Sequence, residues 1–69
     1  MKIIDARGRA CPEPVVMTMK GIKENPEGIE VLVDNVCAVE NVTRFAGSRR
    51  YQVKREDDGA QCRLTLTKG

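Results

Sequence analysis

Two prolines on either side of Glu13 constrain this chain more than any other feature of its sequence. The segment reads Cys11-Pro12-Glu13-Pro14, and an apolar pattern of helical period follows it. A proline disfavours the α conformation in the residue before it, so Cys11 is expected to be extended and just outside a helix. Pro12 suits the first helical position, and Pro14 still lies in the first turn, where backbone N–H groups have no intrahelical partner. The two prolines therefore predict a helix that begins at residue 12.

The expected helix start has a chemical consequence for Cys11. The N-terminal end of a helix carries a partial positive charge, which favours a thiolate and lowers the pKa of a thiol. Arg7 and Arg9 would favour the thiolate too if they lie close, whereas Glu13 would oppose them modestly. The alternative is that Cys11 is a small buried apolar residue, as most free cysteines are. The segment thus indicates a reactive thiol as the first candidate functional group.

The rest of the chain alternates β-branched segments with helical patterns. Strands are expected at residues 2–5, 29–33, 51–55 and 61–67, and helices at 12–24 and 36–46. The expected inward stripe of the first helix is Val15, Val16, Met19 and Ile22, with Met17 on the opposite side. In the second helix, the residues expected to face inward are Val39, Val42 and Ala46, with Ala38 and Phe45 at the edge of the stripe.

Turn and cap residues separate these elements. Residues 25–28, Asn-Pro-Glu-Gly, are expected to end the first helix, and Asp34-Asn35 offers a cap for the second. Gly47-Ser48 is expected to end the second helix. Asp57-Asp58-Gly59 is a hairpin signal, which makes the last two strands antiparallel. In the loop before Cys11, Gly8 supplies conformational freedom.

The element order βαβαββ predicts the fold. Two crossovers of the usual right hand put both helices on one face of a single sheet. We therefore expect one α+β domain over residues 1–69, a two-layer sandwich with a mixed four-stranded sheet and one largely bare face. Both helices then begin at the same edge of the sheet, where open α/β sheets carry their functional sites.

Composition excludes several classes of function. The 12 Lys and Arg residues against 10 Asp and Glu leave a net charge of +2, too mild to indicate nucleic acid, and Phe45 and Tyr51 are the only aromatic residues. The basic residues Arg44, Arg49, Arg50, Lys54 and Arg55 fit a solvated face or a docking surface for an acidic partner better than an RNA-binding patch. The chain has no histidine and no C-x-x-C, so neither a metal nor another cofactor is expected.

Cysteine usage indicates the compartment. Three widely separated cysteines do not form a secreted disulfide framework. The sequence shows no signal peptide and no run of about 18 apolar residues that could span a membrane. We therefore expect a cytoplasmic monomer without a membrane partner.

The other two cysteines differ from Cys11 in their surroundings. Cys62 shares a strand face with Leu64 and Leu66, which favours core packing. Cys37 is expected in the first turn of the second helix, which also lowers a thiol pKa, although a half-buried packing role is an open alternative. Cys37 could form a disulfide with Cys11 if their Cα atoms lie within about 7 Å. The sequence therefore leaves a thiol redox switch as one hypothesis.

A second hypothesis follows from what accompanies Cys11. Acyl transfer would need a general base, and the chain offers only carboxylates and lysines for that role. A small domain of this size also has little room for a large enclosed active site. A thiolate without a base suits the carriage of a group between larger partners. Sulfur is the expected cargo, because thiol–disulfide-type exchange requires only an accessible nucleophilic sulfur.

The pattern Asp5-x-x-Gly8-x-x-Cys11-Pro12-x-Pro14 resembles the signature of the TusA-like, or SirA-like, sulfur-carrier family, and the resemblance covers the whole chain. It implies a persulfide on the residue that matches the family cysteine, Cys11, and a sulfurtransferase-type carrier more than a stand-alone enzyme. The implied donor is a cysteine desulfurase or a rhodanese. The acceptor would belong to tRNA thiolation, molybdenum-cofactor or sulfur-oxidation chemistry. The motif residues expected to position the thiol are Asp5, Gly8, Pro12, Glu13 and Pro14.

Further segments resemble one branch of that family. These are Val33-Asp34-Asn35, Val39-Glu40-Asn41-Val42 and Phe45-Ala46, which resemble the N-terminal domain of YedF-type proteins. Such proteins are associated with selenium metabolism and carry a second, DsrE-like domain, which implies a DsrE-like acceptor. Met19 stands where better-known carriers have a basic residue, which leaves Lys20 nearby. The residues expected to stabilise the thiolate or contact partners are Arg7, Arg9, Lys20, Asp34 and Phe45.

The family also resembles the C-terminal domain of translation initiation factor 3 at the level of the fold. That likeness implies an RNA-binding module as a third hypothesis, although fold alone does not carry function.

Overall fold

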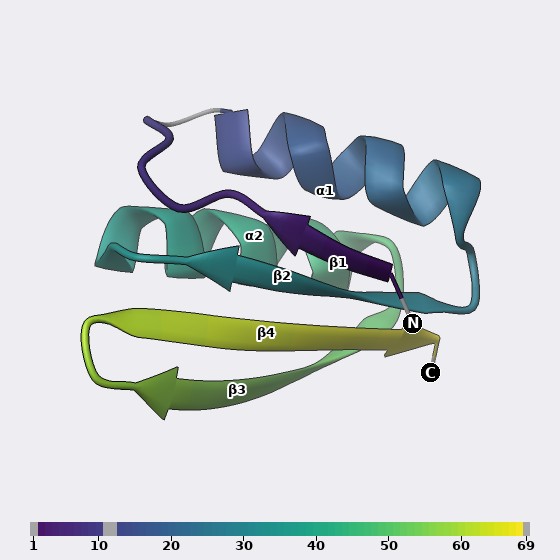
Figure 1. Cartoon of the computed structure of the whole chain (residues 1–69). Coiled ribbons are helices and arrows are strands. Elements are labelled where there is room, and N and C mark those ends of the chain that lie inside the picture. The colour runs from purple at the N-terminus through teal and green to yellow at the C-terminus, as the bar shows by residue number, and fades with distance from the viewer. Residues whose placement is uncertain (1, 11–12, 69) are drawn as a thin grey trace.

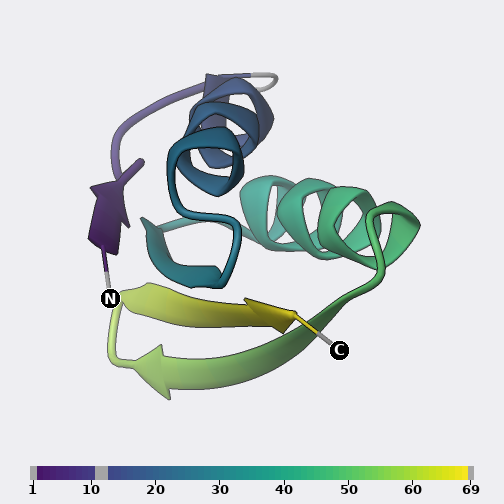
Figure 2. The same cartoon turned by 90° about the vertical axis from the view of Figure 1, so that its right-hand side faces the viewer.

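The computed structural model describes residues 2–10 and 13–68. Its elements, in chain order, are β1 (Lys2–Asp5), α1 (Glu13–Glu24), β2 (Gly28–Val33), α2 (Val36–Ser48), β3 (Tyr51–Asp58) and β4 (Gln61–Lys68). The predicted order βαβαββ is thereby confirmed. Both helices lie on one side of the sheet, as the two views show (Figures 1 and 2). Neither helix of the described residues has the length and apolar character needed to cross a membrane.

The sheet is mixed, as expected, and its strand order is β1-β2-β4-β3. The first two strands are parallel, and β4 is antiparallel to both of its neighbours. The last strand of the chain therefore lies between β2 and β3 (Figure 1). One row across the sheet joins Ile4 to Val31, Val31 to Leu64 and Leu64 to Arg55. The row ends on the charged residue Arg55, so the apolar core does not extend onto β3 at this position.

The core lies between the helices and the sheet. Its buried members are Ile4, Ala6, Ile29, Val31, Val33, Ala38, Val39, Val42, Ala46, Leu64 and Leu66. The inward prediction for Val39, Val42 and Ala46 is confirmed, whereas Ala38 is fully buried and not at the edge of the stripe. No helix covers the other face of the sheet in the described part of the chain (Figure 2).

The predicted stripe of α1 was half right, because Val15 and Ile22 are partly buried and pack against the core as expected, but Val16, Met19 and Met17 were misplaced. Val16 and Met19 are 43% and 45% exposed, while Met17 is partly buried and packs against the core. The helix instead buries small residues, namely Pro14, Thr18 and Gly21. The Thr18 hydroxyl donates a 2.8 Å hydrogen bond to the Pro14 carbonyl, so its burial leaves no polar group unsatisfied.

Gly21 explains why small residues face the sheet. A Cβ at this position would lie 2.9 Å from the Ile29 Cδ1 atom and 3.1 Å from the Ile4 Cδ1 atom. Real Cβ atoms essentially never approach as closely as the first of these distances. The helix axis therefore lies closer to β1 and β2 than a stripe of large side chains would allow.

The start of α2 agrees with its predicted cap. Asn35 has an extended backbone, and its side-chain oxygen accepts a 2.8 Å hydrogen bond from the Ala38 N–H group. The predicted end of this helix was wrong, because Gly47 and Ser48 are still helical. The Ser48 hydroxyl donates to the Phe45 carbonyl at 2.6 Å, and the left-handed conformation falls on Arg50 instead.

The hairpin between β3 and β4 is present but its turn is shorter than predicted. Asp57 and Asp58 belong to β3 and pair with residues of β4. The turn consists of Gly59 and Ala60, and Gly59 has a φ of 65°. Only glycine among ordinary residues adopts that conformation without cost, so the turn falls there.

Candidate functional site

Both helices begin at the edge of the sheet where β1 and β2 end, as predicted (Figure 1). The chain leaves β1 through residues 6–10, here called the carrier loop, and reaches Cys11 directly afterwards. The fully buried Ala6 extends the strand pairing, because its N–H group donates a 2.9 Å bond to the Leu32 carbonyl. The carrier loop thus begins from a fixed point in the sheet.

Arg7 is held by two side chains. Its Nε and Nη2 atoms donate to the two carboxylate oxygens of Asp5, each at 2.9 Å, and its backbone N–H donates to the first oxygen at 3.2 Å. The remaining Nη1 atom donates to the Gln61 side-chain oxygen at 2.8 Å. Gln61 is the first residue of β4, so this contact joins the carrier loop to a distant strand.

The Asp5–Arg7 pair has a clear electrostatic effect. The hydrogen bond from Arg7 lowers the pKa of the Asp5 carboxyl from 3.8 to about 2. The contribution of this pair to stability is therefore complete above pH 3.8 and is lost as the pH falls through about 2. At neutral pH the positive charge of Arg7 always faces a carboxylate.

Gly8 is anchored through its backbone. It has a φ of 74°, and its N–H group donates a 2.8 Å hydrogen bond to an Asp34 carboxylate oxygen. The other oxygen of Asp34 accepts from the Asn35 side-chain amide at 3.3 Å. Asp34 therefore joins the carrier loop to the cap of α2. We expected Asp34 as a possible partner contact, and this anchoring contact was not anticipated.

The residues that flank Cys11-Pro12 also contact each other. The Glu13 N–H group donates a 2.9 Å hydrogen bond to the Ala10 carbonyl, and Arg9 lies 3.5 Å from the Glu13 carboxylate. The expectations for Cys11 and Pro12 themselves lie outside the described residues. Pro14 lies in the first turn of α1, as predicted, and is fully buried.

Cys37 lies in the first turn of α2, as predicted, at the sheet edge where the carrier loop also lies. Its side chain is exposed rather than half-buried. The Asn41 side-chain amide donates to its sulfur at 3.5 Å.

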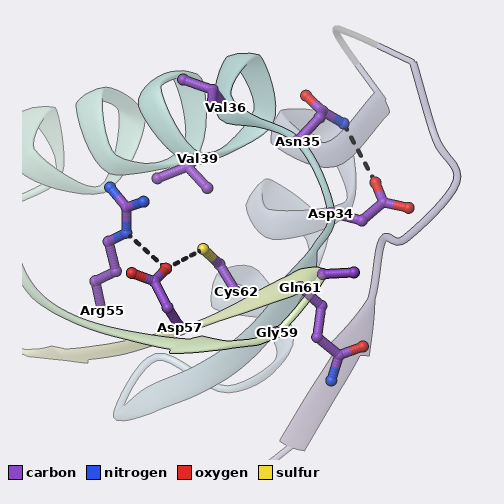
Figure 3. Close-up of a pocket in the computed structure, with 10 residues that line it drawn as sticks. Asp34, Asn35, Val36, Val39, Arg55, Asp57, Gly59, Gln61 and Cys62 are labelled. Carbon is purple, nitrogen blue, oxygen red and sulfur yellow. Dashed lines mark hydrogen bonds and ion pairs between the residues drawn. The ribbon is translucent and has the colours of Figure 1, made fainter.

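Cys62 lines a cavity of about 200 Å³ between the start of α2 and the β3–β4 hairpin (Figure 3). The thiol donates a 2.6 Å hydrogen bond to an oxygen of Asp57, and the Arg55 Nε atom donates to the same oxygen at 3.1 Å. Val36 and Val39 form the opposite wall. The prediction of core packing for Cys62 holds only for one side of the residue, which is partly buried against the core.

Arg55, Asp57 and Cys62 form a hydrogen-bonded cluster, and the sequence pattern of β3 contains a signal for it that the predictions did not use. Alternation along β3 places Arg55 and Asp57 on the same face as Val53, toward the helices. The same alternation places Lys54 on the bare face. The five basic residues that we considered as a patch therefore do not share one surface.

The cluster keeps Cys62 protonated. The hydrogen bond to Asp57 raises the pKa of the Cys62 thiol, and burial adds to this effect. The pKa of Asp57 is lowered by the same hydrogen bond and by Arg55. Since the thiolate is the nucleophile, Cys62 is a poor candidate for accepting sulfur at neutral pH.

Replacing Asp57 with asparagine should make Cys62 more reactive. The amide oxygen can still accept from the thiol, but the negative charge that opposes ionisation is gone. We expect alkylation of Cys62 at pH 8 to become several-fold faster, since each unit of pKa changes the thiolate population about tenfold. Peptide mass spectrometry of iodoacetamide-treated protein measures this rate, with Cys37 of the same chain as the control. An unchanged rate would mean that Asp57 does not hold the thiol proton.

Apolar residues that are exposed or partly buried lie between the two helices. A groove of about 340 Å³ is lined by Met19, Ile22, Lys23, Phe45 and Arg49. The Arg49 guanidinium lies 5.2 Å from the centre of the Phe45 ring, close enough for a cation–π interaction. Lys20 is exposed on α1 beside a neighbouring hollow. The expected partner contacts Lys20 and Phe45 thus both border shallow depressions.

A metal centre is not evident in the part of the chain that the structure describes. No group of three or more His, Cys, Asp or Glu side chains there could hold a metal ion.

Comparisons with known proteins identify the family of this chain. The family model described as "Sulfurtransferase TusA" matches residues 2–68. Relatives from Methanocaldococcus jannaschii and Bacillus subtilis, each named "putative sulfur carrier protein", are 38% and 31% identical over 71 residues. Each alignment covers 99% of this chain and 95% of the relative.

A solved structure shows the same fold. The crystal structure of a SirA-like protein from Desulfitobacterium hafniense superposes with a TM-score of 0.88 at 34% identity. The match covers 100% of this chain and 99% of that protein. Given the family match over nearly the whole length, the chain belongs to the TusA sulfurtransferase family.

Proposed function

We propose that this chain is a sulfur carrier that holds a persulfide on Cys11. The family match and the names of the relatives support a carrier role. The structural observation that supports the proposal most is the anchoring of the carrier loop, which leads directly into Cys11. Its residues are joined to β1, β4 and the start of α2 by hydrogen bonds of 2.8–2.9 Å.

The proposed chemistry is an exchange of one S–S bond for another. The Cys11 thiolate attacks the outer sulfur of a persulfide on the donor. The bond between Cys11 and that sulfur forms as the S–S bond of the donor breaks, and the donor leaves as a thiolate. No oxidant, reductant or cofactor is consumed. Repetition of the same step toward an acceptor thiol releases the sulfur.

Cys11 is the best candidate among the three cysteines. Cys62 is held protonated by Asp57, which disfavours nucleophilic attack. Cys37 lies on α2 and is not part of the anchored loop. In this proposal the donor is a cysteine desulfurase or a rhodanese, and the acceptor is a protein of the DsrE-like kind. Residues 1–69 act as one cytoplasmic domain.

The loading reaction tests this function. The purified chain is incubated with a cysteine desulfurase and free cysteine, and intact mass is measured before and after reduction. We expect a gain of one sulfur atom that a thiol reductant removes. Proteolytic mapping should place the added sulfur on the peptide with Cys11. Sulfur mapped to Cys37 or Cys62, or no gain at all, would contradict the proposal.

A further inference from the structure

We propose that Gln61 and Asp34 are positioning residues, which fix the place at which the Cys11 sulfur is presented. Arg7 then acts as the link in this arrangement and not as a positive charge beside the thiolate. The inference rests on the proposed carrier function, because it concerns the site at which sulfur is loaded.

The first contact joins the carrier loop to β4. Arg7 uses three of its nitrogen atoms at once, two on Asp5 and one on Gln61. This fork of donors holds the guanidinium plane in one orientation, which a flexible ammonium group could not do. Gln61 is itself held in place, since it pairs with Asp58 directly beside the hairpin turn.

The second contact joins the carrier loop to the start of α2. Asp34 binds the backbone N–H of Gly8, so the side chains of the loop have no part in this bond. Asp34 follows the last residue of β2 and precedes the cap residue Asn35. Its position is therefore set by the sheet on one side and by a helix on the other.

Together the contacts restrain the carrier loop at two consecutive residues, from elements far apart in the chain. Gln61 lies 54 positions from Arg7, and Asp34 lies 26 positions from Gly8. Cys11 follows Gly8 by only three residues, so its Cα can lie no more than about 11 Å from that anchor. A sulfur exchange requires the attacking and accepting sulfur atoms to be aligned, so restraint of this loop bears directly on the transfer rate.

The positive charge of Arg7 is already balanced by the Asp5 carboxylate. Asp5 binds it through both carboxylate oxygens, which leaves little net positive charge for a thiolate. If Arg7 acted by charge, lysine in its place would preserve the effect. If Arg7 acts as the link, lysine removes the fork and should behave like a loss of the contact.

The experiment measures the rate of persulfide formation on Cys11 in matched variants. Gln61→Ala and Asp34→Ala each remove one anchor, and Arg7→Lys removes the fork but keeps the charge. Gln61→Glu and Asp34→Asn keep an acceptor oxygen in the same place. Gln52→Ala is the control, because Gln52 is an exposed glutamine on the neighbouring strand β3. The pH dependence of Cys11 alkylation by iodoacetamide is recorded for every variant.

We expect Gln61→Ala, Asp34→Ala and Arg7→Lys to slow loading about tenfold, because misplacement of a reacting atom by a fraction of an ångström has effects of this order. Gln61→Glu, Asp34→Asn and Gln52→Ala should load like the parent. The midpoint of the alkylation profile should stay constant in Gln61→Ala and Arg7→Lys, since the charge near the thiol is unchanged in both.

Three results would overturn the inference. They are normal loading by Gln61→Ala and Asp34→Ala, failure of the conservative variants to restore loading, and a midpoint that moves in Gln61→Ala or Arg7→Lys. Thermal unfolding of each variant shows whether slow loading comes from a misplaced Cys11 or from a chain that no longer folds. A parent chain that takes up no sulfur contradicts the proposed function itself, and so differs from a parent that loads while Gln61→Ala loads equally well.

Discussion

Replacing Cys11 with serine should abolish sulfur loading, while Cys37→Ser and Cys62→Ser load nearly as well as the parent chain. The hydroxyl of serine is not ionised at neutral pH and cannot form the S–S bond that the carrier requires. The other two thiols cannot substitute, because Cys62 is kept protonated and Cys37 is on another element. Intact mass after incubation with a cysteine desulfurase and cysteine measures all three variants.

The same series separates a carrier from a redox switch. A switch that joins Cys11 to Cys37 predicts the loss of two titratable thiols in one chain after mild oxidation. It also predicts that Cys37→Ser changes the product. A carrier predicts that Cys37→Ser remains loadable and that the added sulfur stays removable by a reductant. Persistence of loading in Cys11→Ser would refute the assignment of the thiol.

Much of the fold was predictable, because its signals are local. Pro14 early in α1, Asn35 before α2 and Gly59 in the hairpin each fulfil a backbone requirement within a few residues of their own position. The alternation of β-branched residues indicated the strands for the same reason. Boundaries failed where a side chain extended an element, as Ser48 does for α2 through its bond to Phe45.

Apolar periodicity predicted only part of the packing face of α1, namely Val15 and Ile22. Periodicity ranks residues by hydrophobicity, so Val16 and Met19 looked more inward than Thr18 and Gly21. Close approach of a helix to a sheet selects small residues instead, and a threonine can be buried when its hydroxyl bonds to the preceding turn. How close the helix approaches depends on Ile29 of β2, which the pattern of α1 does not contain.

In the candidate site, too, local sequence signals were predictable and long-range contacts were not. The spacing of Asp5, Gly8 and Cys11 is visible in the sequence and carried the resemblance to the family. Gln61 and Asp34 were not assigned an anchoring role, since their contacts depend on the position of β4 and on the junction of β2 with α2. Long-range partners of a loop require the topology, and no local pattern states which strand lies beside which.

Gly21→Leu should markedly destabilise the packing of α1 against the sheet. Even a Cβ at this position would lie 2.9 Å from the Ile29 Cδ1 atom and 3.1 Å from the Ile4 Cδ1 atom, so a whole leucine side chain must displace these two side chains or α1 itself. Overpacking of this kind costs about 1–3 kcal/mol. A domain this small has a free energy of unfolding of about 5 kcal/mol, so this cost is a large fraction of its stability. The melting temperature should fall by roughly 10 °C, since each 1 kcal/mol lost shifts it by about 4–8 °C in a domain of this size.

Gly47 supplies the matched control, because it is also a helical glycine, but a Cβ there would meet no heavy atom within 4 Å beyond its own helix and neighbours. Gly47→Ala should stabilise the chain by up to about 1 kcal/mol through helix propensity alone. Thermal denaturation followed by circular dichroism measures both variants. Opposite shifts would show that the contact with Ile29, and not the loss of glycine, destabilises Gly21→Leu. Because α1 begins directly after Cys11-Pro12, a displaced helix should also slow sulfur loading, whereas Gly47→Ala should leave loading unchanged.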